Sequence, residues 1–305
     1  MKSRLILVVI LACLSLLAGA CAPTAASTPT SAALALKDGL GRQVTLPGPA
    51  MKIISLAPSN TEILYAIGAG VDVIGRDDFS NYPPEAKSLP SVGGSMGKYD
   101  LEEITRLQPD LVLAASLNTP EQVQSIENLG LKVFYIANPT TFDGLCANLL
   151  TAGQLTGHTP QAEQLVSSLK QRVKAVEDNV TKTTGRPKVF YELDATNPAM
   201  PWTAGPGSFI DTLIKMAGGV NVAGSLKSDY AQISQEELIA TNPDVILLGD
   251  GAYGVTPAQV AARPGWGDIA AVKNNRVLTF NDDLVSRPDP RLVDGLELVD
   301  KALHP

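Results

Sequence analysis

One long amphipathic segment near the middle of the chain constrains the fold more than any other feature. From Thr159 to Lys182 the sequence reads TPQAEQLVSSLKQRVKAVEDNVTK, with Pro160 where a first helical turn tolerates proline and no further glycine or proline before Gly185. We expect Thr159 to cap this helix. Its apolar residues form one stripe at spacings of three and four: Ala162, Leu165, Val166, Leu169, Val173, Val176 and Val180. The stripe predicts a rod of roughly 35 Å, either a bundle or coiled-coil helix or a connection between two folded bodies.

The first twenty residues have the layout of a secretory signal. Lys2 and Arg4 precede the apolar run 5–17, which is too short for a comfortable membrane span, and small residues lead to Cys21. This ending resembles a bacterial lipoprotein signal, in which Cys21 would become the lipid-bearing first residue; an ordinary signal peptide cut nearby is the alternative. Residues 21–35 are poor in charge and rich in Ala, Thr, Ser and Pro, which predicts a flexible tether.

Charge and cysteine content narrow the possible partners. Removing residues 1–20 lowers the formal net charge from −7 to −9, so nucleic acid is not an expected partner. The mature chain keeps only Cys146 besides Cys21, so we expect no internal disulfide and a buried, inert thiol. The histidines, His158 and His304, are far apart, so no histidine metal site and no cofactor are expected. Capture of bare ferric iron by tyrosines and carboxylates remains open.

Strand-like and helical runs alternate on both sides of the long helix. Before it we expect a hairpin within 37–46 and then strands and helices at 53–57, 59–68, 71–75, 101–107, 110–114, 120–129, 132–136 and 142–155. Beyond it we expect strands and helices at 188–193, 209–217, 235–241, 244–248, 276–280 and 290–303. The strands are continuously apolar, as in a mainly parallel sheet flanked by helices. The sequence therefore predicts two α/β bodies, 36–158 and 185–305, joined by a linking helix at 159–184.

The two bodies also contain an internal repeat. DLEEI at 100–104 leads through QPD to LVLAA, and SQEEL at 234–238 leads through NPD to VILLG, 134 positions later. Each copy has a capping residue followed three positions later by glutamate, which predicts a capping box. Glu102 and Glu236 then fall at the second helical position, near the positive end of the helix dipole and facing water.

Several segments together resemble the substrate-binding proteins of ABC importers of the long-helix-linked class, which serve cobalamin, haem and ferric siderophores. The resemblance covers nearly the whole mature chain. Besides the long helix, it is carried by IISLAPSNTEILYAIGAG, IGRDDFSNYPPEA, SVGGSMGKYDLEEITRLQPDLVLA, WTAGPGSFIDTLIKMAGGVNV and SRPDPRLVDGLELVDKALHP. It implies two Rossmann-like lobes joined by one long helix, with the ligand held between them.

The resemblance also implies partners and a location. In cobalamin-binding members, one exposed glutamate on each lobe docks onto arginines of the permease, and these glutamates match Glu102 and Glu236. We therefore expect an exported monomer that is lipid-anchored to a bacterial membrane, either in the periplasm or on the outer face of the cell membrane. Its partners would be an ABC permease with its ATPase and a small metal chelate or corrinoid.

Ligand contacts are expected on loops beyond the carboxyl ends of the strands. The candidates are Pro58, Ser59, Asn60, Phe79, Tyr82, Ser95, Met96, Trp202, Tyr230, Tyr253 and Arg287. The sequence departs from cobalamin-binding relatives at Ser95 or Met96 and at Ala115, where tryptophans would be expected, so haem and siderophores stay open as ligands. Trp202 could stack on the ligand and Arg287 could pair with an anion such as a propionate.

Two alternatives belong to other classes. Gly93 to Gly97 fits the G-x-S-x-G pattern of a serine hydrolase with Ser95 as nucleophile, but Pro90 interrupts the preceding run and Asp100 caps the next helix several residues later. The second alternative is a ligand sensor that works without an importer.

Overall fold

The computed structural model describes residues 33–305, so the predicted signal peptide, Cys21 and most of the predicted tether lie outside the described residues. Residues 34–305 form one compact unit built around two main sheets. In the part of the chain that the structure describes, no helix combines the length and the apolarity needed to cross a membrane.

The N-terminal lobe contains a fully parallel sheet, as predicted. Its strands lie in the order β4 (Val73–Arg76), β3 (Ile53–Ser55), β5 (Leu111–Ala115) and β6 (Val133–Ile136). The helices of this lobe are α2 (Pro58–Ala66), α3 (Leu101–Leu107), α4 (Pro120–Glu127) and α5 (Phe142–Thr156). The predicted hairpin is a separate antiparallel pair, β1 (Leu34–Lys37) and β2 (Gln43–Leu46).

The C-terminal lobe contains a mixed sheet. Its strands lie in the order β10 (Tyr230–Gln232), β8 (Trp202–Ala204), β7 (Lys188–Asp194), β11 (Val245–Leu248) and β12 (Val277–Thr279), with β9 (Val220–Asn221) also paired to β7. The contacts of β7 with β11 and of β11 with β12 are parallel, whereas β8 is antiparallel to both β7 and β10. The helices here are α7 (Phe209–Met216), α8 (Gln235–Thr241), α9 (Pro257–Ala261), α10 (Ala270–Lys273), α11 (Asp283–Ser286) and α12 (Leu292–Leu303).

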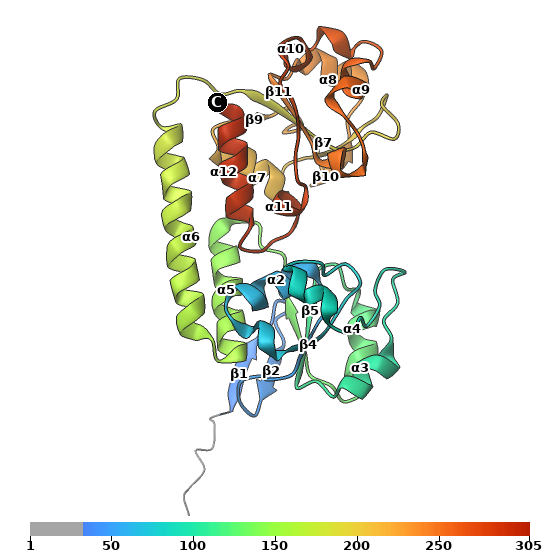
Figure 1. The fold of residues 1–305 in the computed structure, drawn as a ribbon, viewed down its shortest axis with the longest axis vertical. Coiled ribbons are helices and arrows are strands. Elements are labelled where there is room, and N and C mark those ends of the chain that lie inside the picture. Colours follow the sequence, from blue (N-terminus) through green and yellow to red (C-terminus); the bar gives the residue numbers. More distant parts are fainter. Residues whose placement is uncertain (1–32) are drawn as a thin grey trace, which may run out of the picture. The chain divides into compact units, whose positions relative to one another are not determined.

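The long helix is α6 (Thr159–Val180), and it packs on α5 of one lobe and α12 of the other (Figure 1). Five residues of the predicted stripe are buried and the other two, Leu165 and Val180, are half-buried. They belong to one apolar cluster that runs from the N-terminal sheet through α6 to the C-terminal sheet. Arg172 adds ion pairs from α6 to Asp294 and Glu297 of α12, at 2.6 Å each. The helix therefore joins part of each lobe's core into one apolar cluster, while each lobe keeps a second, separate cluster of its own.

Several predicted helix starts are wrong by one or two residues. His158, not Thr159, is the N-cap of α6, and α12 starts at Leu292, not at Pro290. Ala57 is the N-cap of α2, and Pro58 opens that helix one residue before its predicted start at Ser59. A proline at the first helical position needs no amide partner, which is why the chain can turn directly into the helix there.

A second connection between the lobes is an ion cluster around Glu62, which we call the Glu62 cluster. Glu62 lies on α2 and is only 3% exposed. Its carboxylate accepts hydrogen bonds from Arg287 at 2.8 Å and from two nitrogens of Arg291 at 2.5 and 2.7 Å. Arg291 also lies over the ring of Tyr82 at 3.9 Å. Both arginines come from the SRPDPR segment between α11 and α12, so this segment is tied to the N-terminal lobe.

The environment of the Glu62 cluster contains another acid. Asp289 is fully buried and accepts a hydrogen bond from the amide of Arg291 at 2.7 Å. Burial, and then the nearby Glu62 carboxylate, raises the pKa of Asp289 well above its usual value. Glu62 is the carboxylate that both guanidinium groups share, so its loss would leave Arg291 without this ion-pair partner and Arg287 with Asp283 and Asn81 only.

We predict that Glu62→Gln destabilises the protein by about 3–5 kcal/mol, the usual cost of breaking a buried ion pair from one side. Urea unfolding at pH 7 measures this loss. The matched control is Glu163→Gln on the exposed side of α6, which should change stability by less than about 0.5 kcal/mol. An unchanged unfolding midpoint for Glu62→Gln would show that the network contributes nothing to stability.

Candidate functional site

Parallel strands of one sheet end at the same edge, so the loops after β3, β4 and β5 lie together in the N-terminal lobe. A buried hydrogen-bond chain holds two of these loops. Thr61 donates to Ser55 at 2.8 Å and contacts the hydroxyl of Ser80 at 2.7 Å, and Ser80 donates to Asp77. Burial raises the pKa of Asp77, although the bond from Ser80 opposes that rise. The chain fixes the loop that carries Phe79, whose ring is 54% exposed.

The neighbouring loop carries Ser95 and Met96. Asp78 accepts hydrogen bonds from the hydroxyl of Ser91 at 2.5 Å and the amide of Ser95 at 3.0 Å, and these two serines lower its pKa. Met96 is 87% exposed. This loop therefore carries an exposed apolar side chain next to Ser95, whose amide binds an ionised carboxylate.

Two of the three ligand contacts predicted in the first turn of α2 are largely inaccessible to solvent. Ser59 and Asn60 are buried, and the Asn60 amide donates to the carbonyl of Ala114 at 3.1 Å, which ties α2 to β5. Asn118 and Tyr99 form a similar internal contact at 2.6 Å. Of this turn, only Pro58 is partly accessible.

In the C-terminal lobe, Trp202 and Tyr230 lie in strands, not in the predicted loops. Trp202 pairs with Gln232, so it projects from the same face of the β8–β10 ribbon as Tyr230, two residues away along β10. Diagonal neighbours of this kind are within reach of aromatic side chains. Both are nearly half exposed. The structure thus brings two predicted aromatic residues together on one open face.

Carboxylates lie behind this aromatic pair. The buried Tyr191 donates to Asp282 at 2.8 Å. Burial, followed by the nearby Asp282 and Asp229, raises the pKa of Tyr230, so its phenol stays neutral at physiological pH. Tyr253, also a candidate, is almost fully exposed.

A buried ionic group lies at the ends of β7 and β11. Glu192 is fully buried and binds Arg263 through two hydrogen bonds of 2.5 and 2.8 Å, and the guanidinium lies 4.5 Å from the centre of the Trp266 ring. Asp250 is 5% exposed. Neither of its carboxylate oxygens has a hydrogen-bond partner among residues 33–305. Burial and then the Glu192 carboxylate raise the pKa of Asp250 to about 6.

Sequence reasoning missed Glu62, Arg291, Glu192 and Arg263. A signal existed for both glutamates, because each is a charged residue inside an otherwise apolar helix or strand, TEILYAI or VFYEL. Such a charge is costly to bury without a partner. Their arginine partners are 71 to 229 positions away in the sequence, so only the fold identifies them.

Arg287 and Tyr82 are occupied by other protein groups. Arg287 donates to Glu62 and Asn81, and pairs with Asp283, at 2.8 to 2.9 Å. Tyr82 lies against Arg291 and, with Tyr65 and Pro290, lines a crevice of about 300 Å³ between the two lobes. The predicted pairing of Arg287 with an anion stays a prediction, but its donors already have protein acceptors.

The surroundings of Ser95 lack the arrangement of a hydrolase. The residues after Ser95 form a turn, and α3 starts only at Leu101. The ring of His158 contacts Thr156, and that of His304 contacts the carbonyl of Ala217. Neither histidine is therefore hydrogen-bonded to Ser95, as a general base would be.

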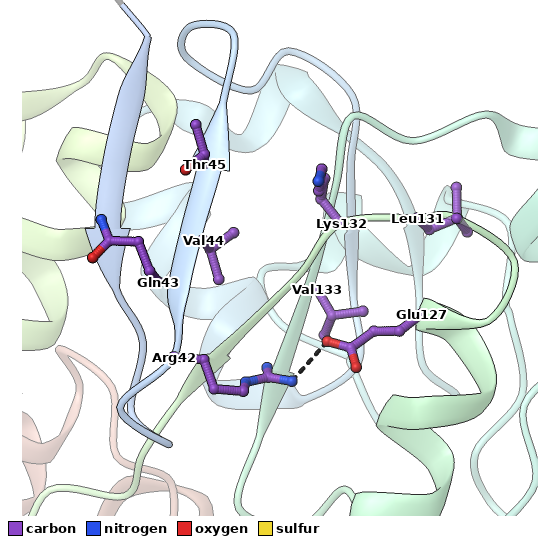
Figure 2. A pocket seen from close by; sticks show the side chains of 9 residues that line it. Arg42, Gln43, Val44, Thr45, Glu127, Leu131, Lys132 and Val133 are labelled. Carbon is purple, nitrogen blue, oxygen red and sulfur yellow. Dashed lines mark hydrogen bonds and ion pairs between the residues drawn. The ribbon is translucent and has the colours of Figure 1, made fainter.

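A larger hollow of about 430 Å³ lies elsewhere, between β2 and the start of β6 (Figure 2). Arg42 and Glu127 form an ion pair of 2.7 Å in its wall. It opens beside Lys132 and Val133, at the amino end of β6. It therefore does not belong to the carboxyl edge where ligand contacts are expected.

Comparison with known proteins decides the family. The family model described as periplasmic binding protein matches residues 53–284, well over half of the chain. The chain belongs to the periplasmic binding proteins. It is 31% identical over 276 residues to a substrate-binding lipoprotein of an ABC transporter from Bacillus subtilis, covering 88% of this chain and 85% of that protein.

Two further relatives of this binding protein have named ligands. A cobalamin-binding protein from Halobacterium salinarum is 30% identical over 274 residues, covering 88% of this chain and 73% of that one. The solved structure of a periplasmic haem-binding protein from Roseiflexus sp. RS-1 has a TM-score of 0.74 at 28% identity, covering 84% of this chain and 98% of that chain. The predicted two-lobed α/β fold is thus confirmed.

The internal repeat is visible in the structure of the binding protein. Helices α3 and α8 begin and end 134 positions apart, and each is followed by a residue in the left-handed conformation, Gln108 and Asn242. Asp100 and Ser234 cap the helices by accepting from the amides three residues later, at 2.9 and 3.1 Å.

Glu102 and Glu236 of the repeat are placed as predicted, but the capping boxes predicted for Glu103 and Glu237 are incomplete. Glu102 and Glu236 are exposed at the second helical position. The predicted capping box does not close in the first copy, because the Glu103 carboxylate binds Arg106 at 2.6 Å instead. In the second copy the Ser234 cap is present without a return bond from Glu237. Asp100 and Ser234 therefore cap their helices without the return bond from glutamate that would complete a capping box.

Proposed function

We propose that this protein is the extracytoplasmic component of an ABC importer that captures a cobalamin-type, haem or ferric-siderophore ligand between its lobes and passes it to the permease without turnover. The observation that carries the proposal is the pair Trp202 and Tyr230, held on one exposed strand face at the ligand edge of the C-terminal lobe. Exposed aromatic faces suit planar or macrocyclic ligands. Phe79 and Met96 supply apolar surface on the N-terminal lobe.

The continuous core through α6 supports a rigid mode of capture. A helix packed on both lobes resists bending, because bending would separate well-packed side chains. We therefore expect closure by only a few degrees when ligand binds. Tight binding then depends on surfaces already formed in the free protein.

Ligand binding is predicted to quench the fluorescence of the two tryptophans, the exposed Trp202 and the buried Trp266. Cyanocobalamin, haem and a ferric trihydroxamate are titrated in turn, and calorimetry checks each response. Trp202→Ala should weaken binding by roughly tenfold, since stacking on an aromatic ring contributes about 0.5–1.5 kcal/mol beyond its buried area.

Leu298→Ala is the control for this substitution, because Leu298 has the same 44% exposure but lies on α12. It should leave affinity unchanged. If none of the three ligand classes binds at micromolar concentration, the ligand assignment is wrong while the family assignment stands.

Membrane attachment through lipid on Cys21 is the second part of the proposal, supported by the signal-like sequence and the lipoprotein relative. Cys21→Ser should abolish labelling by a fatty-acid probe and release the protein from membranes. Cys146→Ala removes the buried thiol of α5 and should keep both labelling and attachment. Retention of Cys21→Ser on membranes in high salt would contradict this attachment.

The third part of the proposal concerns docking, in which Glu102 and Glu236 bind arginines of the permease. Either change to alanine should lower uptake and leave ligand affinity and folding nearly unchanged, because Asp100 and Ser234 keep the caps. Each loss leaves a permease arginine unpaired, a penalty on the order of 2–5 kcal/mol when the pair is desolvated.

Uptake is measured in cells that carry each variant in place of the natural gene, with Glu163→Ala as the control from the exposed side of α6. The double variant should be worse than either single one. Normal uptake by the double variant would show that neither glutamate is needed for docking to the permease.

A further inference from the structure

The loops at the carboxyl edges of the two sheets carry more negative than positive charge. Asp78 of the N-terminal lobe is exposed and ionised, since hydrogen bonds from Ser91 and Ser95 favour its charged form. In the C-terminal lobe, Asp229 and Asp282 lie near Tyr230. Each of these acids is next to an exposed aromatic or apolar candidate for ligand contact.

Asp250 adds an acid of a different kind. It is buried beside Glu192, and neither oxygen accepts a well-formed hydrogen bond in the described part of the chain, although the Ala195 amide and the Glu192 carboxylate are close enough to influence its pKa. The guanidinium of Arg263, which lies near it, already makes two bonds to Glu192. A buried carboxyl group left without a donor favours a donor or a positive charge supplied from outside.

The arginines near these edges already donate to protein acceptors, which are neutral carbonyl oxygens for Arg76 and carboxylates for Arg287 and Arg291. Arg76, the last residue of β4, donates to the carbonyls of Ala86 and Asp77 at 3.0 and 2.8 Å. Arg287 and Arg291 are bound in the Glu62 cluster. Two exposed lysines, Lys98 and Lys227, remain in the nearby loops, where water and salt screen a flexible ammonium group strongly.

From this distribution of charge we infer that the ligand carries no net negative charge. The aromatic faces of Trp202 and Tyr230 support the same inference, because the negative face of an aromatic ring attracts cations and not anions. The inference rests on the proposed function, and it narrows the ligand to neutral or cationic chelates. Haem with two ionised propionates and ferric catecholates would then bind poorly.

The test compares ligands that differ only in charge. Three pairs serve: cyanocobalamin and its monocarboxylate, haem dimethyl ester and haem, and a ferric trihydroxamate whose pendant amine is either acetylated or succinylated. On the cobalamin or hydroxamate scaffold, the anionic member should bind roughly tenfold more weakly, the size expected for one unit charge a few ångströms from another in a partly solvated site; haem, with two ionised propionates, should lose more. Added salt should reduce the difference in affinity between the two members of a pair.

A variant connects this preference to the acids named above. Asp282→Asn can still accept from Tyr191 and should bring the two members of the pair closer in affinity. Asp294→Asn, on the α6 side of α12, is the control and should leave the ratio unchanged. Circular dichroism checks that both variants are folded.

The outcomes separate the two claims. Equal or tighter binding of the anionic member overturns the charge inference and leaves the proposed function in place. Failure of every scaffold to bind overturns the proposed function, and the charge inference with it. A charge preference that Asp282→Asn does not change refutes the role of these carboxylates.

Discussion

The apolar stripe of α6 is the constraint on which the rest of the structure depends. A single helix cannot bury such a stripe alone, and this one buries it against α5 at one end and α12 at the other. The two sheets are therefore not independent domains on a flexible linker, because one apolar cluster runs through both. Any large rotation between the lobes would expose part of that cluster, at a cost of about 25 cal/mol for each Å².

The Glu62 cluster adds a directional contact to this non-directional one. Hydrophobic packing along a helix tolerates small sliding movements, whereas two guanidinium groups on one buried carboxylate accept little variation in geometry. The cluster also holds the loop of Asn81 and Tyr82 against the C-terminal lobe. Ionic bonds therefore fix the position of that loop, which carries a candidate ligand contact, relative to the C-terminal lobe.

The candidate site combines exposed aromatic rings with acids and with arginines that already have partners. This combination follows from how each group is held: the β8–β10 pairing presents Trp202 and Tyr230, and protein carboxylates hold the arginines. An anion entering such a site would have to displace internal ion pairs to reach an Arg287 or Arg291 guanidinium, and otherwise meets only the exposed, solvated Lys98 and Lys227. A neutral amide-rich or cationic ligand needs no such exchange.

The sequence by itself determined the elements with strong local signals. Helix α6, the repeat of α3 and α8 with their caps, the buried Cys146 and the four parallel strands of the N-terminal lobe follow from periodicity, capping residues and continuous apolar runs. These signals operate within a few residues of one another, so no knowledge of the fold is needed to detect them. The family resemblance adds the expected position of the ligand between the two lobes and the docking role expected of Glu102 and Glu236.

Only the tertiary structure decided which candidate side chains are free. Arg287, Tyr82, Ser59 and Asn60 are all plausible ligand contacts from their positions in the chain, but each is buried or engaged by another protein group. The short strands β8 and β10 are also invisible locally, since each has three residues and is stabilised only by its neighbours. The partner of Glu62 lies more than 220 residues away. Whether a charged side chain is available to a ligand depends on such distant partners, and chain folding alone brings them together.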